Sequence, residues 1–388
     1  MQIVRVETAV VRVPVHPGSW NSPEYGPPEW DELPIVLVRL TTDEGIVGIG
    51  ETRGGGRAER TIKGLKPKII GEDPTNLNRI QQLLGLQPDI QVRSGLDIAC
   101  WDILGKALGV PIYRLLGGKY RDRVRMYADS GGPVGWGLGS PDPEAFANRA
   151  RNVLRKGFDA MKVDVDMPAH SQPGFDGALK EAEVALMERQ VEAIRDVIGD
   201  EMPLAIDCHG KFSPTSAVKV ANRLSRFKPW WLEDPVPFAD LEGLSEVRSQ
   251  TDVPISVGEV FPTRLDFREL IRRNAASILG PDSITTGGLT EFRRIAELAE
   301  VYRLPVSPHN MTTPVATVAT AHVCAALPNF VALEHHFQDF DWWDNLVEEG
   351  PVIKDGYIAV PEKPGIGLNL NEPELLKHLR PGEDSIWS

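Results

Sequence analysis

The sequence has few cysteines, no long apolar run and no cluster of positive charge. Its 388 residues include only Cys100, Cys208 and Cys324, which are widely spaced and form no C-x-x-C motif. A disulfide framework or a structural zinc site is therefore not expected. Acidic residues outnumber basic ones by 55 to 42, which gives a net charge of −13. Because this charge repels phosphate, we expect no nucleic-acid partner.

The sequence also lacks features of export or membrane insertion. The N-terminal stretch MQIVRVETAVVRV alternates apolar with polar or charged residues, whereas a signal peptide needs an uninterrupted apolar run. No segment approaches the roughly 20 apolar residues that a membrane-spanning helix requires. We therefore expect no membrane association and a cytoplasmic location.

The first part of the chain predicts a small α+β unit. Residues 2–13 and 34–52 alternate with period two around a turn at 43–45, which indicates an antiparallel sheet. Between them lies HPGSWNSPEYGPPEW, whose length and composition are typical either of an active-site lid or of an exposed connector. Residues 58–116 have a helical pattern, including a core helix that ends at Gly109.

From residue 123 onward a strand, a loop and a helix recur eight times. The predicted strands are RVRMYADS, AMKVDVD, PLAIDCHG, WWLEDP, PISVGE, SILGPD, LPVSPH and FVALEHH. Six of them end in a polar residue, at intervals of 23 to 27 residues, namely Asp207, Glu233, Glu259, Asp282, His309 and Glu334. This interval is the length of one strand, one helix and two loops.

Eight such units predict an α/β fold with a (β/α)8-type, modified TIM barrel. We expect an α+β capping domain over 1–122, with a specificity loop at about 16–31, the barrel over 123–350, and a segment over 351–388 that returns to the capping domain. An open doubly wound sheet is the alternative, but no G-x-G-x-x-G follows a strand. In a barrel, function is located at the C-terminal ends of the strands, where the polar residues fall.

The acids at three successive strand ends predict a metal site. Asp207, Glu233 and Glu259 would converge at the barrel mouth, and three nearby carboxylates repel one another unless a cation lies between them. Oxygen ligands favour Mg²⁺, with Mn²⁺ as a substitute, over zinc or copper. Capping of the following helices is the alternative role for each acid.

The ordered motifs resemble the enolase superfamily, in particular its mandelate racemase branch. They comprise SGLDIACWDILGKALGVPIYRLLGG, the acids of AIDCHG, WLEDP and SVGE, then GPDSITTGG, VSPHN and PEKPGIGLNL. The resemblance implies abstraction of the proton alpha to a carboxylate, with Mg²⁺ stabilising the enediolate. It also implies a homo-oligomer.

The same resemblance assigns the acid and base groups. His309 and Asp282 match the family's His-Asp dyad, in which histidine takes the alpha proton. The racemases carry K-x-K at the second strand, whereas this chain has Lys162 and Asp164. Without a second lysine, Lys162 is expected to contact the substrate carboxylate or a hydroxyl. Asp164 is expected first to pair with Lys162, and otherwise to bind a sugar hydroxyl.

A D-x-H-G sequence at residues 207–210 resembles the galactonate dehydratase type, in which the histidine protonates the departing hydroxyl. His209 is the corresponding acid here, since hydroxide is a poor leaving group; a purely supporting role beside a metal ligand is its alternative. Cys208, which faces the other way, is expected to pack. Glu334 is expected to bind the substrate carboxylate, and Trp20 of the early loop to contact the substrate.

Together these residues predict a Mg²⁺-dependent dehydratase that converts an aldonate into a 2-keto-3-deoxy acid. Two alternative functions would use the same metal site. The first is an epimerase or lactone cycloisomerase that shares the proton abstraction, and the second is a sugar-acid-binding protein without turnover.

Overall fold

The structure is a computed structural model of the chain. It describes residues 1–15, 32–85, 89–132, 140–167, 170, 174–336, 338–379, 382–383 and 385–388. The predicted specificity loop, including Trp20, lies outside these residues, so its expected place over the barrel mouth stays a prediction. Among the described helices, none combines the length and the apolar character that a membrane span needs.

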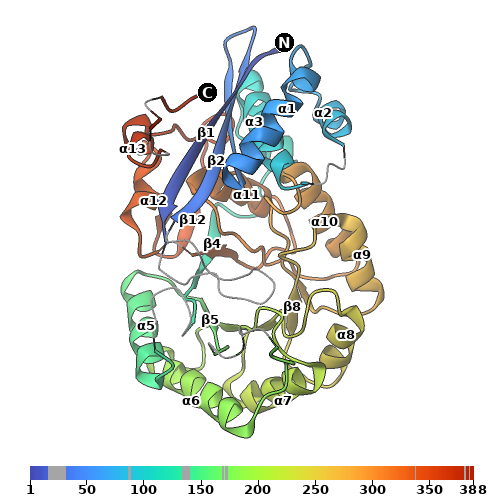
Figure 1. Ribbon diagram of the computed structural model, residues 1–388, viewed down its shortest axis with the longest axis vertical. Coiled ribbons are helices and arrows are strands. Elements are labelled where there is room, and N and C mark those ends of the chain that lie inside the picture. The colour runs from blue at the N-terminus through green and yellow to red at the C-terminus, as the bar shows by residue number, and fades with distance from the viewer. Residues whose placement is uncertain are drawn as a thin grey trace.

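The N-terminal unit is a three-stranded antiparallel sheet covered by helices, as the sequence predicts (Figure 1). The strands are β1 (Ile3–Pro14), β2 (Glu32–Thr42) and β3 (Val47–Arg53), in the order β1-β2-β3. The helices are α1 (Gly55–Ile69), α2 (Leu77–Leu84), α3 (Val92–Leu108) and α4 (Ile112–Leu115). Apolar side chains of the sheet and of α1 to α3 form one buried cluster.

Helix α3 is the packing centre of this unit. A side chain at Gly50 would place its Cβ 2.0 Å from the carbonyl oxygen of Gly95, so glycine lets α3 lie directly on β3. The helix ends at Leu108 and is capped by Gly109 in the left-handed conformation, as predicted. Most of α3 is buried, so its buried surface is wider than the single apolar face that the sequence pattern indicates.

The second unit is a closed parallel barrel. Its strands are β4 (Arg123–Asp129), β5 (Met161–Asp164), β6 (Leu204–Asp207), β7 (Leu232–Glu233), β8 (Ile255–Val257), β9 (Ile278–Leu279) and β10 (Leu333–His335). The seventh predicted strand contributes only Val306, which bridges Leu279 and Phe330 in parallel. Since β10 pairs in parallel with β4, the ring closes, which decides against an open sheet.

Helices form the outer layer of the barrel (Figure 1). They are α5 (Pro143–Arg155), α6 (Glu181–Ile198), α7 (Pro214–Leu224) with the short 3₁₀ helix η2 (Ser225–Phe227), α8 (Leu241–Ser249), α9 (Arg264–Arg272), α10 (Leu289–Val301), α11 (Pro314–Ala325) and α12 (Asp341–Asn345). Inside the ring, a separate buried cluster includes Tyr127, Ala205, Trp231, Ile278 and Ala332. This apolar layer forms a floor beneath the polar strand ends.

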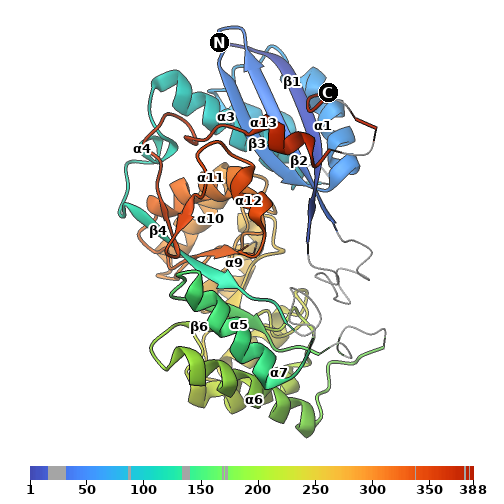
Figure 2. The same ribbon diagram turned by 90° about the vertical axis from the view of Figure 1, so that its left-hand side faces the viewer.

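The C-terminal segment contacts both units. Strands β11 (Ile353–Lys354) and β12 (Tyr357–Ala359) form a hairpin whose second strand pairs antiparallel with β4. The chain then passes α13 (Glu372–Leu376) and reaches the N-terminal sheet, where Leu379 bridges Val11 (Figure 2). The hairpin on the barrel is a feature that the sequence pattern did not indicate, and the domain boundaries at 122 and 350 stay predictions.

Two buried carboxylates of the N-terminal unit cap helices of the barrel. Glu51 of β3 accepts hydrogen bonds from the backbone N–H groups of Thr313 (2.8 Å) and Ala316 (3.1 Å), at the start of α11. Asp97 of α3 accepts one from the N–H of Thr290 (3.0 Å), in the first turn of α10. Because helix N-termini carry partial positive charge, these contacts stabilise the buried acids and fix one unit on the other.

Candidate active site

The predicted polar residues meet at the C-terminal ends of the barrel strands. Strand register places Asp164 of β5 opposite Asp207 of β6, and Asp207 opposite Glu233 of β7. Three carboxylates on adjacent strands therefore lie side by side above the apolar floor.

The Lys162 side chain lies among the acids and is 1% exposed. Its Nζ is 2.7 Å from Asp207 Oδ2, 2.6 Å from Glu233 Oε1 and 2.5 Å from Glu334 Oε1. Although burial lowers the pKa of Lys162, these carboxylates raise it well above its ordinary value. Lys162 is therefore a charged partner of the acid cluster. The expected pair between Lys162 and Asp164 is not among the described contacts, because three other carboxylates surround the ammonium group.

A second group of acids lies next to this ammonium. Carboxylate oxygens of Glu233, Asp234 and Glu259 all lie within 4.8 Å of one another. Burial and the neighbouring carboxylates raise the pKa values of Glu233 and Asp234 well above the ordinary range, despite the opposing effect of Lys162. Asp234, which the sequence analysis missed, has a buried Oδ1 without a hydrogen-bond partner.

This donor set fits a hard divalent cation. It offers several carboxylate oxygens and more negative charge than Lys162 neutralises. A bound ion such as Mg²⁺ would reduce the repulsion between these carboxylates. Of the three predicted ligands, Glu233 and Glu259 belong to one group of oxygens. Asp207 belongs to another, with Asp164 and His209, and is connected to Glu233 through Lys162.

The two residues of the predicted dyad are in contact. His309 Nδ1 lies 2.6 Å from Asp282 Oδ2, while His309 Nε2 lies 3.4 Å from Glu259 Oε2 and 3.8 Å from Glu334 Oε2. The Asp282 carboxylate also accepts hydrogen bonds from the backbone N–H groups of Ile284 (2.6 Å) and Thr285 (3.1 Å). These contacts fix the ring with Nε2 directed at the acid cluster.

Arg53, at the end of β3, makes a contact that the sequence analysis did not foresee. Its Nη2 forms an ion pair and hydrogen bond with Asp282 Oδ2, the atom that faces His309. Burial raises the pKa of Asp282, but Arg53 and the hydrogen bond with His309 together lower it to about 2. The N-terminal unit thus contributes a charge to the dyad. In the sequence, the only indication of this role is the arginine that follows the GET sequence of β3. A sequence pattern by itself does not show that this arginine reaches the barrel.

His209 lies beside three aspartates. Its Nδ1 is 3.9 Å from both Asp164 Oδ2 and Asp166 Oδ2, and 3.8 Å from Asp207 Oδ1. Burial lowers the pKa of His209, but Asp207 and Asp164 raise it to about 10. The ring is therefore protonated at neutral pH, as a general acid requires.

The backbone places His209 differently from the expected extension of a strand. β6 ends at Asp207, and His209 adopts the left-handed conformation with φ of 50°, followed by Gly210 with φ of 66°. A non-glycine residue rarely adopts this conformation, which is frequent at functional turns. Cys208, between Asp207 and His209, is fully buried. Burial raises the pKa of its thiol well above the ordinary value, in keeping with a packing role.

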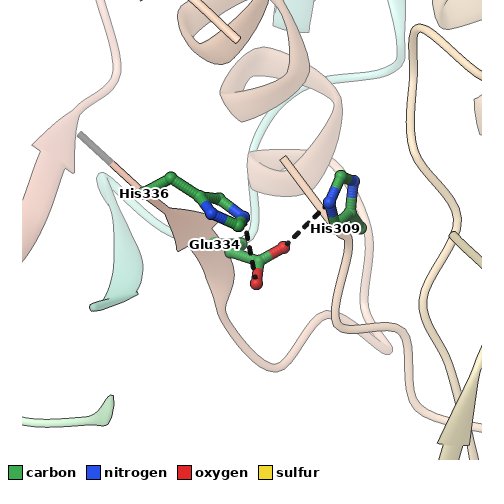
Figure 3. A group of neighbouring side chains, drawn as sticks. All are labelled: His309, Glu334 and His336. Carbon is green, nitrogen blue, oxygen red and sulfur yellow. Dashed lines mark ion pairs between the residues drawn. The ribbon is translucent and has the colours of Figure 1, made fainter. Parts of the chain in front are cut away.

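The eighth strand contributes Glu334 and a second histidine. Glu334 lies between His309 and His336, whose Nε2 is 3.4 Å from Glu334 Oε1 (Figure 3). His336 Nδ1 is 3.0 Å from Asp129 Oδ2 at the end of β4. Burial lowers the pKa of His336, but Asp129 and Glu334 raise it to about 10. The sequence signal for His336 was its position two residues after Glu334, on the same face of the strand.

The neighbouring His335 packs among aromatic side chains. Its ring stacks on Phe158 and packs edge-on against Trp343, and burial lowers its pKa to about 3. It faces away from the acid cluster, as alternation along β10 requires.

Comparison with known proteins identifies the family of both units. Residues 29–117 match the mandelate racemase / muconate lactonizing enzyme N-terminal domain, and residues 145–374 match the enolase C-terminal domain-like family. A structure of a mandelate racemase/muconate lactonizing enzyme-like protein from Rubrobacter xylanophilus superimposes with a TM-score of 0.87 at 36% identity, covering 99% of both chains.

Two relatives carry the names of sugar acid dehydratases. A D-xylonate dehydratase from Haloferax volcanii is 38% identical, over 90% of this chain and 86% of its own length. A D-galactonate dehydratase from Pectobacterium atrosepticum is 31% identical, over 93% of this chain and 94% of its own length. These matches confirm the resemblance inferred from the motifs. The chain belongs to the mandelate racemase / muconate lactonizing enzyme family of the enolase superfamily.

Proposed function

We propose that the protein is a metal-dependent dehydratase of acid sugars, a hydro-lyase that acts on an aldonate. Relatives named as D-xylonate, D-gluconate and D-galactonate dehydratases support this reaction. The substrate carboxylate, C2 and C3 would bind over the acid cluster, between His209 and His309.

The observation that carries the proposal is the placement of His309 and His209. His209 follows β6, the third strand of the ring from β4, and His309 follows Val306 at the seventh position. The third and seventh positions of an eight-membered ring are opposite one another. A planar intermediate held between them would face a base on one side and an acid on the other.

Asp207, Glu233 and Glu259 are proposed to hold the divalent cation, and Mg²⁺ is the ion that their oxygen donors favour, with Mn²⁺ as a substitute. When bound, this cation supplies electrostatic stabilisation of the second negative charge that develops when a carboxylate loses its alpha proton. Asp234, within reach of Glu233 and Glu259, would offer a further carboxylate oxygen there.

His309 is proposed to remove the C2 proton. Its Nδ1 is occupied by Asp282, so Nε2 is the atom that accepts the proton, and the C–H electron pair moves into the carboxylate to give the enediolate. Asp282 then stabilises the imidazolium, because a carboxylate beside the ring favours its charged form.

His209 is proposed to donate a proton to the C3 hydroxyl. As the C3–O bond breaks, water leaves and the electron pair of the enediolate forms the C2–C3 double bond. The resulting enol loses the proton of its C2 hydroxyl, takes up a proton at C3 and becomes the 2-keto-3-deoxy acid. A neutral water is a far better leaving group than hydroxide, which is why the elimination needs an acid.

The remaining assignments complete the proposal. Lys162 and Glu334, adjacent in the acid cluster, are assigned to the carboxylate end of the substrate, and Trp20 to its more distant contacts. A homo-oligomer and a cytoplasmic location are proposed with the function and rest on family resemblance and composition.

The test is a screen of mono- and diacid sugars for keto product in the presence of Mg²⁺, followed by the best substrate in D₂O. Dehydration of an aldonate is the expected outcome. Deuterium incorporation with inversion at C2 and no loss of water would identify an epimerase. Thermal stabilisation by sugar acids without any product would identify a binding protein.

A further inference from the structure

We infer that Asp164 is the positioning residue for His209, so that the site contains two aspartate–histidine couples, one on each side of the substrate. This inference rests on the proposed function of His209 as the acid. Asp164 would accept a hydrogen bond from Nδ1–H of His209 and direct Nε2 at the C3 hydroxyl. It occupies the position where the racemases of the branch carry their second lysine.

The contacts of the three neighbouring aspartates distinguish Asp164 from the others. Asp207 Oδ2 accepts from Lys162, and Asp207 Oδ1 accepts from the backbone N–H of His209 at 3.1 Å. Asp166 forms an ion pair with the buried Lys211. Asp164 Oδ1, Asp166 Oδ2 and His209 Nδ1 are all buried without a hydrogen-bond partner. Asp166 Oδ2 is the atom that pairs with Lys211, whereas among the described residues the only ion pair of Asp164 is with His209. Asp164 is thus the acid with charge left for the imidazole.

The backbone holds Asp164 firmly in place. Its N–H donates to the carbonyl of Gly131 at 3.0 Å, and the next residue, Val165, donates to the carbonyl of Asp207 at 3.3 Å. A side chain at Gly132 would place its Cβ 2.6 Å from the Asp164 Cβ, so the loop after β4 packs directly against it. A rigid carboxylate is suited to orienting a ring, whereas a flexible one would leave several rotamers open.

The distance of 3.9 Å between His209 Nδ1 and Asp164 Oδ2 is longer than a hydrogen bond. Catalytic hydrogen bonds in ligand-free sites are often long and shorten when substrate binds. A rotation of the His209 side chain, which is 26% exposed, would close the gap without movement of the strand. Across the ring, Asp282 and His309 form the same couple at 2.6 Å.

The experiment compares Asp164→Asn with His209→Asn in D₂O, measuring C2 deuterium exchange and keto acid formation on the same aldonate. Asp164→Asn is expected to slow elimination by about 10- to 100-fold, the range seen when a carboxylate that orients a metal-bound histidine is removed, while exchange stays within about twofold. The double variant should be no slower than His209→Asn. Asp176→Asn, which removes an exposed carboxylate nearby, is the control and should behave as wild type.

Several outcomes would overturn the inference. Equal loss of exchange and elimination, or a raised KM alone, would assign Asp164 to the substrate. A higher Mg²⁺ concentration for half-maximal activity would assign it to the cation. Unchanged kinetics would leave it no role. Should Asp164→Asn fail to fold, Asp164→Ser provides the same comparison. If His209→Asn itself lost both activities equally, the proposed function would fail instead.

Discussion

Replacement of Arg53 by methionine tests the coupling between the N-terminal unit and the dyad. The ordinary aspartate pKa of 3.8 is lowered to about 2 in Asp282, with Arg53 as the largest lowering influence. The difference of about 1.8 corresponds to about 2 kcal/mol of stabilisation at pH 7. Arg53→Met should remove an amount of this order, because Arg53 is the largest of the influences that offset burial, while His309 and two backbone N–H groups remain as partners of Asp282.

The stabilisation that the Asp282 carboxylate contributes depends on pH. Since the pKa of Asp282 is lower in the folded protein than in the unfolded chain, its stabilisation is complete above about pH 4 and is lost as the pH falls to about 2. The difference in unfolding free energy between wild type and Arg53→Met should therefore be largest at pH 7 and about half as large at pH 3.

The assay is urea unfolding at both pH values, together with C2 deuterium exchange at pH 7. Exchange should slow in Arg53→Met and recover partly in Arg53→Lys, which keeps the charge. Arg57→Met is a matched control, because the exposed Arg57 pairs with Asp89 at the surface and should change stability by less than about 1 kcal/mol. Wild-type stability and exchange in Arg53→Met would refute the reasoning, as would an equal loss of stability at pH 3 and pH 7.

Three further predictions concern the base, the cation and the contact between the units. His309→Asn should abolish both C2 exchange and dehydration, by about 10²- to 10⁴-fold, measured by NMR in D₂O; retained exchange would remove His309 as the base. Treatment with EDTA should abolish dehydration and Mg²⁺ should restore it, while Glu259→Gln should need more Mg²⁺ for half-maximal activity; full activity of the chelated enzyme would exclude the cation. Glu51→Gln, which weakens acceptance from Thr313 and Ala316, should lower unfolding free energy by about 1 to 3 kcal/mol, and an unchanged urea midpoint would contradict the capping role.

The sequence by itself determined the succession of eight strands and the polar residue at the end of six of them. This was possible because strands and helices leave local periodic patterns, and because the C-terminal ends of parallel strands share one edge of a barrel. The pairing of Asp282 with His309 was implied by the family resemblance, and the contact at 2.6 Å agrees with it. The seventh strand, reduced to the bridges of Val306, was still recognisable because its sequence keeps the apolar pattern.

Only the tertiary structure decided which charges meet. Arg53 reaches Asp282 across 229 positions of sequence, and Lys162 binds three acids from other strands in preference to Asp164, two residues away. Ion pairs depend on side-chain direction and on which elements become neighbours, and neither leaves a local pattern in the chain. The placement of His209 by a left-handed turn, beside Asp164, likewise depends on backbone angles and packing that residue identity alone does not specify.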